Sequence, residues 1–233
     1  MNAVITGATK GMGRAISLKL AEAGYNVAIC SRSQQDVDSF CLELKQLNPN
    51  ITAVGLSTNC AHAEQVYDFV DFVKQHFGQV DVLINNVGTF KPGSILDEEE
   101  SDMMTQFELN FHAAYILCRA FGKQMRERRS GYIINICSMA ALNPVAEAGS
   151  YTVTKFALHG LTKVLRLELK QHNVKVTAIL PGSTLTSSWE GTTLPEDYFV
   201  AADDIANAVL YCLNTKGGAN TDEIVISPLT GQI

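Results

Sequence analysis

Seven short apolar runs, separated by longer segments with helical periodicity, recur along the sequence. The runs are rich in Val and Ile and nearly continuous in apolar character, which is typical of strands covered on both faces. They are AVIT (3–6), NVAICS (26–31), ITAVGLS (51–57), VDVLIN (80–85), YIINICS (132–138), VKVTAIL (174–180) and EIVIS (223–227). Helices are predicted at about 12–24, 34–47, 62–77, 102–128, 150–172 and 203–214. This alternation predicts an α/β fold with a doubly wound, mostly parallel sheet of about seven strands and helices on both faces.

Length and composition limit what such a fold can do. The chain has 233 residues, of which 46% are hydrophobic and 18% charged, as in a globular domain with a sizeable core. No linker or internal repeat divides the sequence, so a single domain is expected over residues 1–233. The net charge of −6 argues against nucleic acid or an anionic membrane as a partner.

Cysteine and histidine residues give no sign of a metal site. The six cysteines are scattered without C-x-x-C or zinc-type spacing, and the five histidines are equally dispersed. We therefore expect the cysteines to be small buried side chains in a reducing compartment. The sequence begins MNAVITG and contains no apolar run of membrane-spanning length, so a cytoplasmic location is expected.

The segment TGATKGMGRAI after the first strand contains Gly7, Gly11 and Gly13 and leads into a helix. Glycines allow a tight turn and a close backbone approach, and the helix N-terminus offers free N–H groups to an anion. A diphosphate suits this turn, although a glycine-rich turn without a ligand remains possible on this pattern alone. The second strand ends at Ser31 and Arg32, where an NAD enzyme usually carries an acidic residue. With Lys10 in the glycine turn, the pattern favours NADP over NAD, unless both cations are ordinary surface residues.

Other polar residues lie where a parallel sheet binds its ligands. Strand four runs into NNVG (85–88), strand five into Ser138, and Tyr151 and Lys155 share one face of the following helix. Asn110 stands in the apolar helix segment FELNFHAAYILCRAF and needs a hydrogen-bond partner if it is buried. Taken alone, the strand-end asparagines are expected to be structural, and a Tyr–Lys helix pair is common on helix surfaces.

Taken together, these motifs resemble the short-chain dehydrogenase/reductase family over essentially the full chain. The family pattern combines a T-G-x-x-x-G-x-G turn, an N-N-A-G stretch, a helix Asn, and Ser, Tyr and Lys with Y-x-x-x-K spacing. The matching residues are Thr6, Gly7, Gly11, Gly13, Asn85, Asn86, Gly88, Asn110, Ser138, Tyr151 and Lys155. The resemblance implies a single-domain Rossmann fold that transfers hydride between a nicotinamide and a carbonyl or alcohol.

The resemblance also implies a role for each residue of the reactive set. Tyr151 would be the general acid or base at the substrate oxygen, and Ser138 would hydrogen-bond that oxygen. A phenol loses its proton reluctantly near neutral pH, so the Lys155 ammonium and the oxidised nicotinamide would favour the phenolate. Lys155 would also hold the nicotinamide ribose, and Asn110 would position water for a proton relay.

By the same resemblance, the cofactor site combines the glycine turn, the ends of strands two to four and PGSTLT (181–186). Thr186 would contact the nicotinamide carboxamide. The full set is Gly7, Thr9, Lys10, Gly11, Met12, Gly13, Ser31, Arg32, Asn59, Cys60, Asn86, Val87, Gly88, Tyr151, Lys155, Pro181, Gly182, Thr184 and Thr186. Val87 departs from N-N-A-G, and Asn59 replaces an Asp that many relatives place against the adenine amino group. An amide oxygen can still accept that bond, but without charge.

The substrate is the least determined part of the sequence. The segment of about 186–201 is short for a loop that closes over substrate in relatives, which implies an open pocket. The chain end EIVISPLTGQI lacks the D-G-G ending of many acyl-carrier-protein reductases and favours small ketones, aldehydes, hydroxy acids or alcohols. The basic cluster KQMRERR (123–129) keeps 3-oxoacyl-acyl-carrier-protein reductase as an alternative, unless its cations serve only the helix end.

Two further expectations follow from the resemblance. A non-catalytic dinucleotide-binding sensor is the alternative from another class, but relatives that have lost catalysis usually lack the Tyr or the Lys. Family members commonly assemble through their two long helices, here about 102–128 and 150–172, so a homodimer or homotetramer is expected. The second of these helices carries more apolar positions than one buried face needs.

Overall fold

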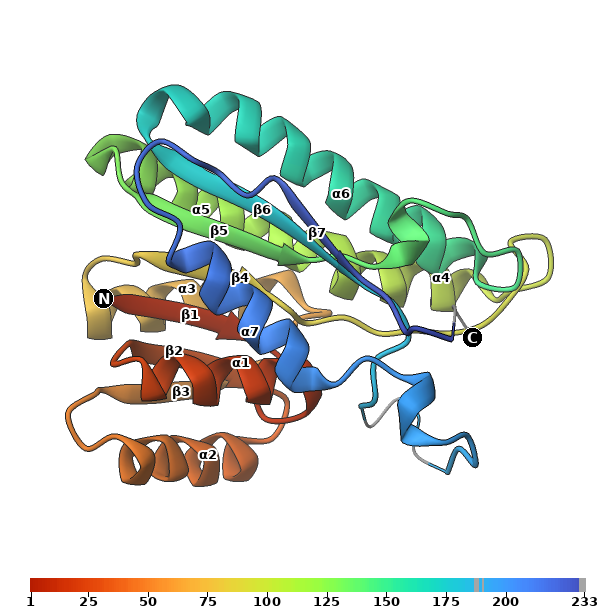
Figure 1. Cartoon of the computed structure of the whole chain (residues 1–233), viewed down its shortest axis with the longest axis horizontal. Coiled ribbons are helices and arrows are strands. Elements are labelled where there is room, and N and C mark those ends of the chain that lie inside the picture. Colours follow the sequence, from red (N-terminus) through yellow and green to blue (C-terminus); the bar gives the residue numbers. More distant parts are fainter. Residues whose placement is uncertain (187–188, 190, 231–233) are drawn as a thin grey trace.

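The computed structural model describes residues 1–186, 189 and 191–230 (Figure 1). Its seven strands form one sheet in the order β3-β2-β1-β4-β5-β6-β7, and every neighbouring pair is parallel. The strands are β1 (Asn2–Thr6), β2 (Asn26–Ser31), β3 (Ala53–Ser57), β4 (Val82–Asn85), β5 (Gly131–Ile136), β6 (Val174–Pro181) and β7 (Glu223–Ile226). The predicted fold class, parallel sheet and seven strands are confirmed.

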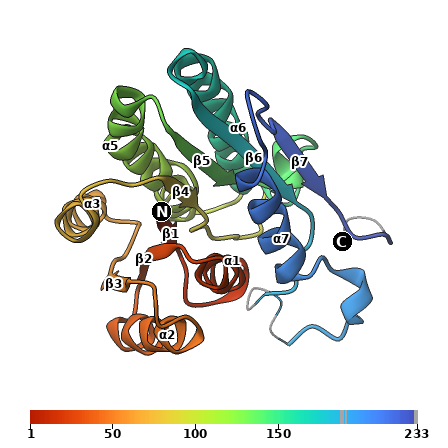
Figure 2. The same ribbon diagram turned by 60° about the vertical axis from the view of Figure 1, so that its left-hand side comes forward.

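Helices cover both faces of this sheet (Figure 2). They are α1 (Gly11–Glu22), α2 (Gln34–Leu47), α3 (Ala63–Phe77), α4 (Glu100–Phe107), α5 (Ala113–Arg128), α6 (Gly149–Leu169) and α7 (Ala202–Leu213). The core under α1, α2 and α7 takes Ala3 and Ile5 from β1, whereas the core under α3, α5 and α6 takes Val4. The near-continuous apolar runs of the inner strands are explained by this alternation, because both faces of these strands are buried, whereas the edge strands β3 and β7 are partly exposed.

The strand order reverses between β1 and β4, which run side by side at the centre of the sheet. Ligands bind at the carboxyl ends of strands next to such a reversal. The hydroxyl oxygen of Thr6, at the end of β1, accepts the N–H groups of Asn86 and Val87, each at 3.0 Å. The Asn86 side-chain amide in turn donates to the carbonyl oxygens of Thr6 at 2.8 Å and Gly7 at 3.1 Å. These hydrogen bonds hold the carboxyl ends of β1 and β4 together at this edge of the sheet.

The long helix predicted at 102–128 is interrupted. A π-helical segment, Glu108–His112, separates α4 from α5, and Asn110 lies in its middle. π-Helical turns inside longer helices often occur at functional sites. The prediction of strand five also extends too far, because β5 ends at Ile136, so Ser138 lies two residues beyond the strand.

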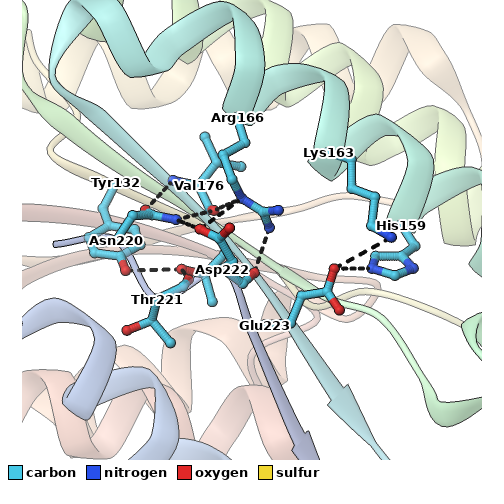
Figure 3. Close-up of polar contacts among 10 residues, drawn as sticks. Tyr132, His159, Lys163, Arg166, Val176, Asn220, Thr221, Asp222 and Glu223 are labelled. Atoms are coloured by element: carbon cyan, nitrogen blue, oxygen red, sulfur yellow. Dashed lines mark hydrogen bonds and ion pairs between the residues drawn. The ribbon is translucent and has the colours of Figure 1, made fainter.

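A group of polar side chains fastens α6 to the C-terminal part of the sheet (Figure 3). His159 Nε2 and Glu223 Oε1 are 2.8 Å apart, and Lys163 Nζ lies 3.6 Å from the same carboxylate oxygen. Arg166 Nε donates to the carbonyl oxygen of Val176 at 2.9 Å. His159 is only 4% exposed, so its contact with Glu223 links a buried position of α6 to the start of β7.

The cysteines are free and buried, as expected from their apolar surroundings. Burial raises the pKa of Cys118 to about 12 and that of Cys137 to about 11, which keeps both thiols protonated. Within the described ranges, no helix is long and apolar enough to cross a membrane.

Candidate active site

The turn between β1 and α1 requires glycine at three positions. Gly7 and Gly11 have φ angles of 63° and 54°, in the left-handed region. A Cβ on Gly13 would lie 2.2 Å from the carbonyl oxygen of Gly7 and 2.5 Å from Nδ2 of Asn86. The side chain of Lys10 does not cap α1, and the first turn of α1 contains no acidic residue. The positive end of this helix is therefore open to an anion such as a diphosphate.

The end of β2 lies against the same turn. The Thr9 hydroxyl donates to Ser31 Oγ at 2.9 Å, so the turn and the strand end form a continuous surface. Lys10 and Arg32, the next residues along the two segments, are exposed, and within the described residues neither side chain forms an ion pair. Two free cations next to a strand end without a carboxylate favour a phosphate group at this place.

The predicted residues after β3 have partners of their own. Asn59 Oδ1 accepts the N–H of Ala61 at 3.2 Å, so a ligand amino group would share this oxygen with the backbone. Cys60 is 4% exposed, and its sulfur lies 4.0 Å from the sulfur of Cys30 on β2. Asn59 and Cys60 therefore lie beside the end of β2, on the same side of the site as Ser31.

The segment after β6 approaches the glycine turn from the other side. Pro181 ends β6, and the hydroxyl of Thr184 donates to the carbonyl oxygen of Gly182 at 2.9 Å. A Cβ on Gly11 would lie 3.1 Å from Cγ2 of Thr186. Thr186, predicted at the nicotinamide, and Gly11, predicted at the diphosphate, are thus in near contact.

Tyr151 and Lys155 lie one turn apart near the start of α6. Lys155 is 5% exposed, and its Nζ donates to the carbonyl oxygen of Ile136 at 3.2 Å. The same Nζ lies 5.7 Å from the centre of the Tyr151 ring. No carboxylate pairs with Lys155 among the residues described. Lys155 therefore brings a buried positive charge close to the Tyr151 ring.

Asn110 connects this pair to the loop after β4. Its side chain is 1% exposed: Oδ1 accepts the N–H of Thr89 at 2.7 Å, and Nδ2 donates to the Thr89 carbonyl oxygen and to Thr154 Oγ1, each at 3.0 Å. A Cβ on Gly88 would lie 3.0 Å from Asn110 Oδ1 and 3.4 Å from Lys155 Nζ. The loop after β4, the π-helical segment and α6 therefore meet at Gly88.

Ser138 follows β5 at the start of a 3₁₀ turn, Met139–Ala141. Its Oγ accepts the N–H of Ala140 at 3.1 Å. Because this bond uses a lone pair of the oxygen, the hydroxyl proton remains available for another acceptor. The carbonyl that Lys155 binds belongs to Ile136, two residues before Ser138.

Two residues at the site were not anticipated from the sequence. The Thr154 hydroxyl donates to the carbonyl oxygen of Tyr151 at 2.8 Å, in addition to its bond from Asn110. The Phe90 ring stands edge to face with the Tyr151 ring, with centroids 5.0 Å apart. Thr154 lies inside the Y-x-x-x-K motif and Phe90 follows Gly88 by two residues, but neither pattern indicates the contact.

The predicted substrate loop at about 186–201 is closed at its base by strand-like pairing. The N–H of Val200 donates to the carbonyl oxygen of Ser183 at 2.8 Å. Inside the loop, Trp189 packs against Phe199 with ring centroids 4.9 Å apart. Residues 187, 188 and 190 of this loop lie outside the described residues. Across the described residues, no group of three or more His, Cys, Asp or Glu side chains is placed to hold a metal ion.

Comparison with known proteins identifies the family. The family model of short chain dehydrogenases matches residues 1–196. The chain belongs to the short-chain dehydrogenase/reductase family. It is 31% identical to a 3alpha-hydroxysteroid dehydrogenase of Mediterraneibacter gnavus, in a match that covers 96% of this chain and 93% of that protein. The chain is accordingly an oxidoreductase of this family that uses a nicotinamide cofactor.

Solved structures of the family share the fold over nearly the whole chain. An alcohol dehydrogenase from the archaeon Thermococcus sibiricus, complexed with 5-hydroxy-NADP, matches with a TM-score of 0.92 and 25% identity, covering 100% of this chain and 98% of that one. A metagenomic short-chain oxidoreductase in complex with NADP matches with a TM-score of 0.84 and 30% identity, covering 98% and 96%.

The residues present fit a nicotinamide dinucleotide. The uncapped start of α1 suits its diphosphate, and the glycines allow the turn to pack closely against Asn86 at the end of β4. The buried Oδ1 of Asn86, at the strand reversal, has no hydrogen-bond partner within the described residues. An unpaired buried oxygen at this position is a further sign that the site accommodates a polar ligand.

Proposed function

We propose that this chain is an NADP(H)-dependent carbonyl reductase or alcohol dehydrogenase with Tyr151 as its general acid and base. The observation that carries the proposal is the buried, unpaired ammonium of Lys155 beside the Tyr151 ring, in a chain of this family. A cation at this position would stabilise the negative charge that develops when the Tyr151 hydroxyl gives up its proton during hydride transfer.

The residues divide the work around one substrate oxygen. The nicotinamide, when bound, supplies or accepts the hydride. In reduction Tyr151 donates its hydroxyl proton to the carbonyl oxygen, and in oxidation it removes the proton from the alcohol. Ser138, whose oxygen already accepts the N–H of Ala140, donates its own proton to the same substrate oxygen and stabilises developing charge.

Lys155 and Asn110 support this proton transfer. Lys155 donates one of its three N–H groups to the carbonyl oxygen of Ile136. The other two can bind the ribose hydroxyls of the cofactor and solvent. Asn110 holds the loop after β4 and, in this proposal, lies at the inner end of a water relay that replaces the proton of Tyr151. Its position in a π-helical segment, where the regular helical bonding is interrupted, is consistent with this role.

We assign NADP(H) in preference to NAD(H) because the end of β2 presents Ser31 and Arg32 beside Lys10. Both similar structures reported above contain NADP or a derivative of it. Replacing Arg32 with Ala should raise the KM for NADPH about 10-fold, because a charge-assisted bond is lost, while the KM for NADH changes little. Equal changes for the two cofactors would contradict the assignment.

Small ketones, aldehydes, hydroxy acids or alcohols are the favoured substrates. The alternative within the same chemistry is 3-oxoacyl-acyl-carrier-protein reductase, which the basic cluster at 123–129 would serve. Two cations of that cluster have structural partners, because Arg128 donates to the carbonyl oxygen of Val80 at 2.8 Å and Arg129 to that of Gln171 at 2.8 Å. This favours a structural role for them. The relative from Mediterraneibacter gnavus, named as a hydroxysteroid dehydrogenase, adds secondary alcohols to the substrates worth testing.

The assay that tests the function follows NADPH absorbance with a panel of small ketones and an acetoacetyl thioester, repeated with NADH. We expect turnover of at least one small ketone with NADPH. Faster turnover of the thioester would favour the carrier-protein reductase. Cofactor binding without turnover of any carbonyl would favour the non-catalytic sensor.

We further propose a homodimer or homotetramer formed through α5 and α6. On α6, large apolar side chains are left uncovered, with Val153, Val164 and Leu167 at 56%, 51% and 64% exposure. Apolar surface on one long helix is typical of an interface with a second copy. Light scattering at micromolar concentration that gave the mass of one chain would contradict assembly.

A further inference from the structure

The aromatic ring of Phe90 occupies a place that the family chemistry does not require. It stands edge to face with the Tyr151 ring, at a centroid separation of 5.0 Å and an interplanar angle of 87°. Phe90 lies in the loop after β4, whereas Tyr151 belongs to α6. Phe90 is nevertheless 52% exposed, so the residue is partly open to solvent beside the proposed acid and base.

The backbone on both sides of Phe90 is held by buried amide side chains. Thr89 is bound through its N–H and its carbonyl oxygen by Asn110, at 2.7 and 3.0 Å. The N–H of Lys91 donates to Oε1 of Gln106 at 3.1 Å. Asn110 and Gln106 are 1% and 0% exposed, so both anchors belong to the packed interior. The backbone on both sides of Phe90 is therefore held in place by hydrogen bonds to buried side chains, and this fixes where the ring is attached.

The segments that carry Phe90 and Tyr151 expose apolar side chains next to this ring. The ammonium of Lys91, its neighbour in the chain, is paired with the carboxylate of Asp102. The segment between Ser138 and Tyr151 exposes Leu142 and Val145, at 38% and 44%. The loop that carries Phe90 and the segment before Tyr151 thus both expose apolar side chains. A phenyl ring has no strong hydrogen-bonding group, so a polar substituent placed against it would lose water without replacement.

We propose that Phe90 is a specificity-determining residue that forms an apolar wall beside Tyr151. It selects carbonyl or alcohol substrates whose substituent next to the reacting carbon is aliphatic or aromatic, over those whose substituent is charged or hydroxylated. The reason is geometric: a substrate oxygen bonded to the Tyr151 hydroxyl places one of its substituents near the ring that packs on Tyr151. The inference rests on the proposed function and narrows its substrate class to apolar ketones, aldehydes and alcohols, with hydroxy acids disfavoured.

The test compares two ketones of similar size, one with a phenyl substituent and one with hydroxymethyl substituents, at saturating NADPH. The wild-type protein should prefer the phenyl ketone. In the Phe90→Ala variant, kcat/KM for that ketone should fall about 10-fold or more, mainly through KM, because apolar contact is lost. The value for the hydroxylated ketone should change little, and Phe90→Leu should retain most of the preference.

Tyr67→Ala is the matched control, because Tyr67 is an aromatic residue of α3 with 53% exposure. It should alter neither ketone. NADPH binding and the thermal midpoint, measured for each variant, establish that the protein remains folded. An equal loss on both ketones in Phe90→Ala would overturn the proposal, since it would mean that the ring only supports Tyr151. No loss on either ketone would also overturn it. Absence of turnover in the wild-type protein would instead refute the proposed function.

Discussion

Replacing glycine with alanine should have opposite effects on the free energy of unfolding at two buried helix positions, Gly13 and Gly122. Gly13 lies in α1, and a Cβ added to it would lie 2.2 Å from the carbonyl oxygen of Gly7 and 2.5 Å from Nδ2 of Asn86. Neither neighbour can move away easily, because Asn86 Nδ2 also bonds that carbonyl oxygen at 3.1 Å. Gly122 in α5 differs, since its added Cβ would lie 3.6 Å from Cδ1 of Ile133, an ordinary contact.

The magnitude follows from these distances. Relief of the Gly13 contact requires a shift of about 1 Å in packed backbone, which we place at about 3 kcal/mol, the upper end for overpacking. Alanine returns about 1 kcal/mol through its better helix propensity, so Gly13→Ala should lower the free energy of unfolding by about 2 kcal/mol. Gly122→Ala makes no such clash and should raise it by up to about 1 kcal/mol.

Urea denaturation of both variants measures this difference, and fluorescence titration with NADPH measures its consequence for the site. Because the displaced carbonyl belongs to the glycine turn, Gly13→Ala should also bind NADPH at least about 10-fold more weakly, whereas Gly122→Ala should bind it normally. Equal stability of the two variants, with equal NADPH affinity, would refute the reasoning.

Two further substitutions test polar contacts between segments that are distant in the sequence. Asn110→Ala removes a side-chain amide that bonds both the N–H and the carbonyl oxygen of Thr89. The free energy of unfolding, measured by urea denaturation, should therefore fall by about 3 kcal/mol. An unchanged urea midpoint would count against this. Burial raises the pKa of Glu223, but the hydrogen bond and charge of His159 and two nearby cations outweigh it, leaving that pKa below its ordinary value of 4.5. The Glu223 carboxylate therefore stabilises the fold above about pH 4.5, and this contribution is lost as the pH falls through the lowered folded-state value. Glu223→Gln should cost about 1 kcal/mol at pH 7 and progressively less below pH 4.5, and a difference that did not vary with pH would contradict the assignment.

The sheet could be predicted from the sequence because burial on both faces leaves a clear signal. β2 and α2 have the predicted bounds, Asn26–Ser31 and Gln34–Leu47. The predicted starts of β3 and β4 were two residues early, since apolar residues also continue into the buried ends of the preceding loops. The roles assigned to the site residues remain predictions, although the structure places the Tyr–Lys pair, Asn110 and Gly88 together.

The rest of the site depends on contacts between distant segments, which have no local signature. The π-helical segment around Asn110 was missed because a single inserted residue leaves the amphipathic pattern of 102–128 nearly intact. The contact of Phe90 with Tyr151 joins a loop to a helix 61 positions later in the chain. Only the tertiary fold places such residues together.

The central claim is that Tyr151 transfers the proton that accompanies hydride transfer, and Tyr151→Phe tests it most directly. The variant loses only the hydroxyl and keeps the ring that packs against Phe90. We predict that NADPH affinity, measured by fluorescence titration, stays close to that of the wild-type protein, while NADPH-dependent turnover of the best ketone falls by at least about 100-fold. Turnover near the wild-type rate would contradict the account.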